Sequence, residues 1–505
     1  MKLFTDRHRS KIRGTLSCFD RVVITGTIPG ICYAAGMTSF LKAQGVRIFD
    51  YPQWAEPLRE EIRVNAERLA QEHGLEIEFI RRKDFRKESR IKEIISRRGD
   101  HPGLVHIFSA MEPCPSYKPW HDKKSHHTFL KPTQAKCLHY YFYCIDPGLG
   151  LCYLRVPTWA PFRLQFYYNG HYQLAAALRR EGITYTMLDN AFMDVEDWDA
   201  TQSLADSIEP ARVHRKLNEV TRQFCPVIRH FPAPYHWSLM QVEYATDIVF
   251  HRQSDLKPIY EELVRTAIYS VKPENIATFL GRKLTGHYQD EIGNDFHTRI
   301  QGMRIKHHMG KVAIKMYDKH AMILRIETVA NDVSFFKHHR KVEHRDGTWT
   351  LKTASMKKSI YSLLPLLGLM WASNQRYLRF ISSVDDPTMA LTELERISKP
   401  ARDSNRTYRG FNLFHGDDLQ LFLALVRGEF TISGFQNATI RMHLLGKTPQ
   451  QVSRFIKRLR KHGLIRKIRN TYKYYLTTLG RRVILTALKL REMFIIPYLR
   501  GALTT

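Results

Sequence analysis

The chain has 505 residues, too many for one ordinary hydrophobic core, so we expect roughly three or four domains. Lysine and arginine number 78 against 49 aspartates and glutamates, which gives a formal net charge of +29 at pH 7. Hydrophobic residues make up 43% of the chain, which excludes a disordered basic tail and indicates that folded domains carry the charge. A basic folded protein attracts polyanions, and nucleic acid is the commonest polyanion in a cell.

The composition also argues against secretion and against a membrane partner. The 7 cysteines are sparse and odd in number, which is typical of a reducing compartment rather than of a disulfide framework. The longest apolar run, Ile360 to Ala372, is too short to span a bilayer and contains Ser362. We therefore expect a cytoplasmic, nucleoid-associated protein.

The chain order predicts an α/β and α+β multidomain protein. Residues 19–110 alternate between β-rich runs and amphipathic helices, which predicts a largely parallel sheet that includes a strand at Val46–Phe49. The turn Asp146-Pro-Gly then predicts a hairpin, and a mostly helical region follows with a helix at Trp237–Phe250. Residues 299–345 again have strand patterns, and residues 398–411 have the composition of a linker. The expected domains are an α/β domain (1–135), a mixed hairpin and helical domain (136–298), a basic β-rich domain (299–397) and a C-terminal domain (412–505).

The C-terminal domain carries the strongest pattern. Thr448 is suited to cap a helix, with Pro449 at its first position and Gln451 three residues after the cap. Apolar residues at helical spacing then form one stripe, and a glycine, two short strands and a second capped helix follow. Between Thr448 and Arg482 there are eleven lysines and arginines and no acid.

This order of elements resembles the winged helix-turn-helix of bacterial regulators of the MarR class. The resemblance implies that the helix at 448–462 enters the major groove of DNA and that the strand hairpin reaches the backbone. The expected nucleic-acid contacts there are Arg454, Lys457, Arg458, Arg460, Lys461, Arg469 and Lys473. The apolar stretch Val483–Leu499 also suggests a homodimer.

A second pattern lies in residues 304–328. Strand alternation would place Lys315 and Tyr317 on one face of a strand, and Arg325 and Glu327 on one face of the next. The run is similar to a stretch of rolling-circle replication initiators, in which a tyrosine hydroxyl attacks phosphorus. This resemblance implies Tyr317 as the nucleophile, with the remaining roles in two groups. Metal would be held by Asp318, Glu327, His307 and His308, and phosphate would be contacted by Lys315, Lys319 and Arg325. Arg304 and Lys306 belong to the basic run 304–345, which we expect to contact the nucleic-acid backbone.

Two other arrangements of ligands compete with the tyrosine. A nuclease or transposase site could use Mg²⁺ or Mn²⁺ held by acids at strand ends and on one helix face; these acids are Asp20, Glu112, Glu243 and Asp247. A structural zinc could be held by residues gathered between positions 114 and 139; these residues are Cys114, His121, Cys137 and His139.

The sequence thus predicts a nucleic-acid-binding protein, with DNA as the expected partner rather than RNA. Its chemistry would be strand cleavage and joining, as in a replication initiator, transposase or nuclease of a mobile element. The alternative is a non-catalytic transcriptional regulator that binds DNA or RNA.

Overall fold

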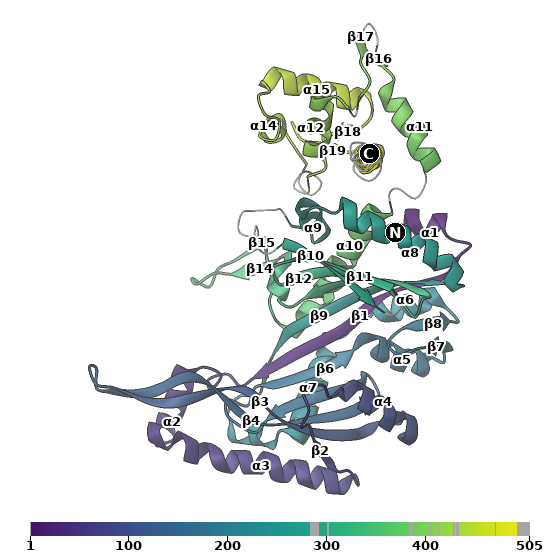
Figure 1. Ribbon diagram of the computed structural model, residues 1–505. Coiled ribbons are helices and arrows are strands. Elements are labelled where there is room, and N and C mark those ends of the chain that lie inside the picture. The colour runs from purple at the N-terminus through teal and green to yellow at the C-terminus, as the bar shows by residue number, and fades with distance from the viewer. Residues whose placement is uncertain are drawn as a thin grey trace, which may run out of the picture. The chain divides into compact units, whose positions relative to one another are not determined.

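The computed structural model describes residues 2–282, 292–299, 302–382, 387–403, 406–412, 414–427, 430, 434–469 and 471–491. The chain is mixed α/β (Figure 1). It divides into two compact units, each assembled from separate stretches of sequence. The first unit contains Met1–Thr15, Thr246–Thr328 and Leu369–Thr505, and the second contains Leu16–Ala245 and Val329–Gly368. In the described part of the chain, no helix is long and apolar enough to cross a membrane.

The second unit is built on a mixed sheet with the strand order β9-β1-β6-β5-β4-β3-β2. The pairs β1–β6, β3–β4, β4–β5 and β5–β6 are antiparallel. The short edge pair β2–β3 is parallel. The prediction of a largely parallel sheet is therefore wrong. The consecutive strands β3, β4, β5 and β6 are joined by short turns rather than by crossover helices, and such strands pair antiparallel. The strands are β1 (Ile12–Thr27), β2 (Ile77–Phe79), β3 (Gly103–Asp122), β4 (His127–Asp146), β5 (Gly150–Pro157), β6 (Leu164–Asn169) and β9 (His236–Phe250).

Helices cover this sheet and close two apolar clusters. Ile91 packs with Val105 and Phe108 of β3, while Leu174 and Leu178 pack against the Leu16 end of β1. The hairpin predicted at Asp146-Pro-Gly is confirmed as β4–β5. The helices are α2 (Ala34–Ala43), α3 (Tyr51–Glu72), α4 (Lys87–Arg98), α5 (Gly170–Glu181), α6 (Trp198–Asp206) and α7 (Pro210–Phe224). The unit also contains a 3-10 helix at Ile48–Asp50 in place of the strand predicted at 46–49, the pair β7 (Tyr185–Met187) and β8 (Phe192–Val195), and the ribbon β14 (Lys337–Glu343) and β15 (Trp349–Ser355).

Residues 237–250 belong to strand β9, so the helix predicted there is wrong. Every residue of β9 from Val242 onward is buried, and a strand that is covered on both faces shows no alternation of polar and apolar residues. The i, i+4 spacing of Glu243 and Asp247 fits one face of a helix, but it also fits one face of a strand. The spacing alone could not separate the two.

The first unit combines a strand meander with the C-terminal helices. The predicted strands of residues 303–328 are confirmed as β11, β12 and β13, and β10 pairs with β11 ahead of them. The strands are β10 (Ile292–Arg299), β11 (Gly302–Met309), β12 (Val312–Lys319) and β13 (Ile323–Ala330). The helices and short strands are α1 (Lys2–Arg7), α8 (Gln253–Ser270), α9 (Pro273–Phe279), α10 (Leu363–Ile381), α11 (Pro387–Ser398), β16 (Ala401–Asp403), β17 (Arg406–Tyr408), α12 (Gly416–Leu425), α14 (Asn437–Arg441), α15 (Pro449–Lys461), β18 (Ile465–Lys467), β19 (Tyr474–Leu476) and α16 (Thr478–Leu490).

The predicted elements of the C-terminal region are confirmed. The hydroxyl of Thr448 accepts a hydrogen bond from the Gln451 backbone, and the Gln451 side chain accepts one from the Thr448 backbone, so the capping box forms. Thr477 caps α16 through one hydrogen bond, which its hydroxyl accepts from the backbone N–H of Gly480. The apolar core beneath these helices also includes Ile397 and Phe411, which precede the predicted start of the domain at residue 412. Residues 492–499 of the apolar stretch suggested as a dimer contact lie outside the described residues.

Candidate functional site

Helix α15 presents a charged face opposite the face that it buries. Val452, Ile456 and Leu459 are buried in the C-terminal core, whereas Arg454, Lys457 and Arg460 are exposed. In the part of the chain that the structure describes, none of these three cations forms an ion pair with an acid. The α15 cation face, defined as Arg454, Lys457 and Arg460, therefore offers positive charge to an outside partner.

Two other cations predicted on this face are already bound within the protein. Lys461 forms an ion pair with Asp403. Arg458 is only 6% exposed, and its guanidinium donates two hydrogen bonds to the Asp418 carboxylate, at 2.7 and 2.8 Å. The prediction that Arg458 contacts nucleic acid is wrong, because position 458 falls on the helical row of Phe455 and His462, at the edge of the buried stripe.

The hairpin after α15 extends the basic surface. Arg466, Lys467 and Arg469 are exposed around the turn that joins β18 and β19, and Lys473 is half-buried. The ring of Tyr472 at this turn is 80% exposed, with the Lys467 ammonium 5.3 Å from its centroid. An exposed aromatic ring beside lysine is suited to stacking against a base, and a pattern of charges along the sequence does not reveal such a ring.

Two β-ribbons of the second unit share one surface feature, a lysine over an exposed tryptophan. The Lys341 ammonium lies 3.9 Å from the ring centroid of Trp349, which is 54% exposed on the ribbon β14–β15. The Lys131 ammonium lies 3.6 Å from the ring of Trp120, which is 43% exposed near the end of β3–β4. A two-stranded ribbon is narrow enough to enter the major groove of DNA.

The meander places the predicted tyrosine beside a carboxylate and a lysine. The Tyr317 hydroxyl donates to Glu327 Oε2 at 2.9 Å, and Lys315 Nζ lies 3.2 Å from Glu327 Oε1. Glu327 is 1% exposed, whereas Tyr317 is half-buried. Strand alternation thus brings Lys315 and Tyr317 to one face of β12, as the sequence predicted.

Three other residues of the predicted tyrosine site, Asp318, His308 and Arg325, do not join this cluster. Asp318 follows Tyr317 in the strand and therefore points to the opposite face, as does His308 relative to His307. A single metal shared by both histidines is excluded by this geometry. The Arg325 guanidinium, also predicted to contact phosphate, is fully buried and bound to Asp247 through two 2.6 Å hydrogen bonds.

The His307 imidazole is bound on both nitrogens within the protein. Nδ1 lies 2.5 Å from the Asn294 side-chain oxygen and Nε2 lies 3.1 Å from the Tyr377 hydroxyl. Burial, with a smaller contribution from His308, lowers the pKa of His307 to about 3. His307 is thus a neutral, structural residue, and the prediction that it binds metal is wrong.

The depressed pKa of His307 predicts a loss of stability in mild acid. Its ordinary pKa near 6.5 applies to the unfolded chain, which therefore binds more protons than the folded chain between about pH 3 and 6.5. Lowering the pH from 7.5 to 5.0 should cost at most about 2 kcal/mol through this residue. Chemical denaturation at both pH values checks this, with His307→Gln expected to lose less stability than wild type. A variant at the exposed His101 is the control, and equal pH dependence in His307→Gln and wild type would contradict the assignment.

The four acids predicted for a nuclease site fall into two groups. Glu112 and Asp247 are each bound to an arginine, whereas Asp20 and Glu243 lie close to each other. Glu112 accepts hydrogen bonds from Arg155, at 2.8 and 2.5 Å, and from the Tyr141 hydroxyl at 2.6 Å. Asp247 is the partner of Arg325, as described above. Each of these two carboxylates is therefore neutralised by a guanidinium, which disfavours metal binding.

Asp20 and Glu243 offer carboxylate oxygens that lie within 4.8 Å of one another. Asp20 Oδ1 accepts hydrogen bonds from the side chains of Asn169 and Asn190, at 3.1 and 2.5 Å. Burial lowers the pKa of the adjacent Arg21, but its interactions with Tyr167, Glu243 and Asp20 raise it above its ordinary value. The two acids are suited to Mg²⁺ or Mn²⁺, which take oxygen ligands from one or two carboxylates.

Two of the four residues proposed for zinc approach each other, because Cys137 Sγ lies 3.8 Å from His139 Nδ1. The interaction of the Cys114 and Cys137 thiols lowers the pKa of Cys114 and raises that of Cys137. His139 Nδ1 lies 3.0 Å from the Cys137 carbonyl, and His121 lies near the hairpin end beside Thr128. Among the described residues, these side chains do not form a group of three metal ligands, so the structure gives no support to the zinc site.

Comparisons of the chain with protein-family models, with curated proteins and with solved structures find no match.

Proposed function

We propose that the chain is a nucleic-acid-binding protein whose C-terminal region works as a winged helix-turn-helix. The carrying observation is the α15 cation face, which lies opposite a buried apolar stripe and is not neutralised by acids of the described chain. DNA is the proposed partner, with α15 as the helix that enters the major groove and the β18–β19 hairpin on the adjoining backbone. Most of these contacts would be to phosphate, so affinity should depend steeply on salt.

Replacing Arg454, Lys457 and Arg460 together by alanine should weaken DNA binding and flatten its salt dependence. If each side chain neutralises one phosphate, the slope of log K against log salt should fall by about 2.7. Fluorescence anisotropy of labelled duplex DNA at several salt concentrations measures both quantities.

A charge-matched control separates this interface from the general effect of a basic protein. Arg59, Arg63 and Arg68 of α3 form surface ion pairs with glutamates of the same helix. Their triple alanine variant removes the same formal charge and should leave the salt slope nearly unchanged. Equal losses in both triple variants would contradict a specific role for α15.

We further propose that Tyr317 cleaves the bound strand, because its hydroxyl already donates to Glu327. The phenol oxygen would attack phosphorus and form a phosphotyrosine bond. The bond from phosphorus to one sugar oxygen would break, and the sugar would leave as a free hydroxyl after taking up a proton. Glu327 would accept the phenol proton and Lys315 would stabilise charge on the phosphate.

A divalent metal is proposed to bind Asp20 and Glu243 of the second unit. Carboxylate oxygens suit a hard cation, and a cation would relieve the repulsion between the two acids. When bound, it would polarise phosphate oxygens.

A further inference from the structure

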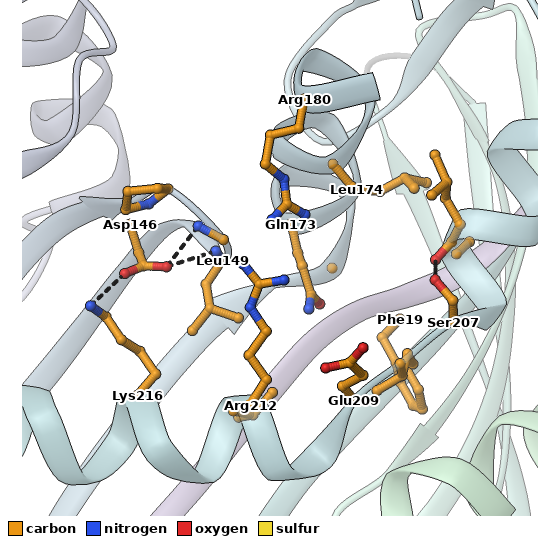
Figure 2. Close-up of a pocket in the computed structure, with 18 of the residues that line it drawn as sticks. Phe19, Asp146, Leu149, Gln173, Leu174, Arg180, Ser207, Glu209, Arg212 and Lys216 are labelled. Carbon is orange, nitrogen blue, oxygen red and sulfur yellow. Dashed lines mark hydrogen bonds and ion pairs between the residues drawn. The ribbon is translucent and has the colours of Figure 1, made fainter. Parts of the chain in front are cut away.

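A cavity of about 610 Å³ lies between α5 and α7 in the second unit, bordered by the turn after β4. Figure 2 shows the side chains that line it, which come from both helices, from this turn and from the β1 residue Phe19. Its volume falls within the range of pockets that hold small organic ligands. The proposed nucleic-acid contacts use none of its residues.

The wall formed by the β4–β5 turn is held rigidly. The Asp146 carboxylate accepts hydrogen bonds from the backbone N–H groups of Gly148 and Leu149, at 2.8 and 3.0 Å. Its other oxygen lies 2.8 Å from the Lys216 ammonium (Figure 2). Lys216 also lies 3.3 Å from the Glu219 carboxylate. The charges of Asp146 and Lys216 are thus satisfied by each other, and the pair ties the turn to α7.

Two arginines of the cavity lack such partners. Arg180, in the last turn of α5, and Arg212, in the first turn of α7, extend their guanidinium groups into the same space (Figure 2). Within the described residues neither side chain has a hydrogen bond or an ion pair. The Arg212 guanidinium lies against Gly148, where an added Cβ would be only 3.1 Å from its Nη2 atom. Facing cations repel each other, and an anion between them would remove the repulsion.

The cavity has an apolar side as well. Phe19 and Leu174 line the part that lies away from Asp146 and Lys216 (Figure 2). Glu209 also lines the cavity, and its carboxylate has no ion-pair partner among the described residues. A ligand that matches this lining has an anionic group at one end and an apolar ring at the other.

We propose that the cavity binds a small phosphate ester of about the size of a nucleoside monophosphate. The phosphate lies between Arg180 and Arg212, each of which can donate two parallel hydrogen bonds to its oxygens. The ring lies against Phe19 and Leu174. This proposal is independent of the proposed DNA contacts of α15, because it uses other residues.

Isothermal titration calorimetry of the full chain tests it with a panel of the four ribonucleoside 5′-monophosphates, adenosine and inorganic phosphate. At least one monophosphate should bind, adenosine should bind more weakly, and inorganic phosphate should compete. Arg180→Ala and Arg212→Ala should each weaken binding about tenfold or more, since each removes charge-assisted hydrogen bonds. Glu209→Gln should tighten binding roughly twofold to fivefold, since it removes a like charge.

Arg179→Ala is the matched control, because Arg179 neighbours Arg180 in α5 but forms a 2.5 Å ion pair with Asp100. It should bind the monophosphate as wild type does, and circular dichroism of each variant verifies folding. Binding that is insensitive to both Arg180 and Arg212, or no binding of any phosphate in the panel, would overturn the proposal. So would a loss of DNA affinity in Arg180→Ala and Arg212→Ala without any small-molecule binding, which would assign the cavity to nucleic acid instead.

Discussion

Replacing Asp418 by alanine is expected to destabilise the C-terminal core by about 3–5 kcal/mol, because it leaves the Arg458 guanidinium buried without its counter-charge. Arg458 donates two hydrogen bonds to this carboxylate and a third, at 3.0 Å, to the Arg409 carbonyl. Its guanidinium also lies 3.9 Å from the ring centroid of Phe411. The pair therefore fixes α15 against α12 and against the segment that precedes α12.

The ionisation of Asp418 follows the same geometry. Burial raises the pKa of the Asp418 carboxyl. Hydrogen bonds from Arg458 and from the Asn412 backbone lower it by more, so the pKa lies below its ordinary value. A carboxyl whose folded pKa is depressed contributes stability above its ordinary pKa, and that contribution is lost as the pH falls through the folded value. Asp418→Ala should therefore show a smaller loss of stability in acid than wild type.

Two comparisons make the Asp418 prediction specific. Asp417 is the adjacent residue, but it forms a more exposed ion pair with Lys447, so Asp417→Ala should cost about 1 kcal/mol or less. The double variant Asp418→Leu with Arg458→Met should cost less than Asp418→Ala alone, because it removes both charges. Chemical denaturation followed by far-UV circular dichroism measures all three variants. Equal effects of Asp417→Ala and Asp418→Ala would show that the buried pair does not hold the core.

The C-terminal elements could be predicted from sequence because their signals are local. The cap, the proline and the apolar stripe of α15 all lie within thirteen residues of Thr448, and helix formation depends on such short spacings. The exception is Arg458, whose partner Asp418 lies 40 residues away in the sequence. A pattern of charge on one helix face cannot reveal such a distant partner, so the sequence does not distinguish the buried Arg458 from the exposed cations of α15.

The strand β9 and the partners of the candidate acids could not be predicted, because they depend on contacts between residues far apart in the sequence. Strand β9 is buried on both faces over most of its length, so its sequence lacks the alternation by which a half-exposed strand is found. Glu112 and Asp247 could be named as candidate ligands, but their arginine partners lie 43 and 78 residues away. The cavity between α5 and α7 likewise depends on Arg180 and Arg212, which have no common motif. Their convergence is a property of the fold.

Replacing Tyr317 by phenylalanine is expected to abolish the covalent protein–DNA adduct that the proposed strand cleavage would form. The substitution removes only the hydroxyl that donates to Glu327, and Lys315 remains beside that carboxylate at 3.2 Å, so the fold should be retained. Incubation with end-labelled single-stranded, hairpin and duplex DNA and Mg²⁺ or Mn²⁺, followed by a denaturing gel, detects the adduct as labelled protein. Tyr269→Phe, at a tyrosine of α8 that is 65% exposed, is the control and should retain full activity.

The remaining variants separate the roles within the reaction. Glu327→Gln keeps the shape of the side chain but cannot accept the phenol proton, so adduct formation should slow by about 10² to 10⁴-fold. Asp20→Asn and Glu243→Gln test the metal site proposed in the second unit, and each should weaken the binding of Mn²⁺. Cleavage that survives Tyr317→Phe but fails in the two acid variants would assign the chemistry to a metal-activated water. Wild-type protein that binds DNA and leaves no adduct and no cut strand would favour the non-catalytic regulator, because tight, salt-dependent binding requires only the α15 cation face.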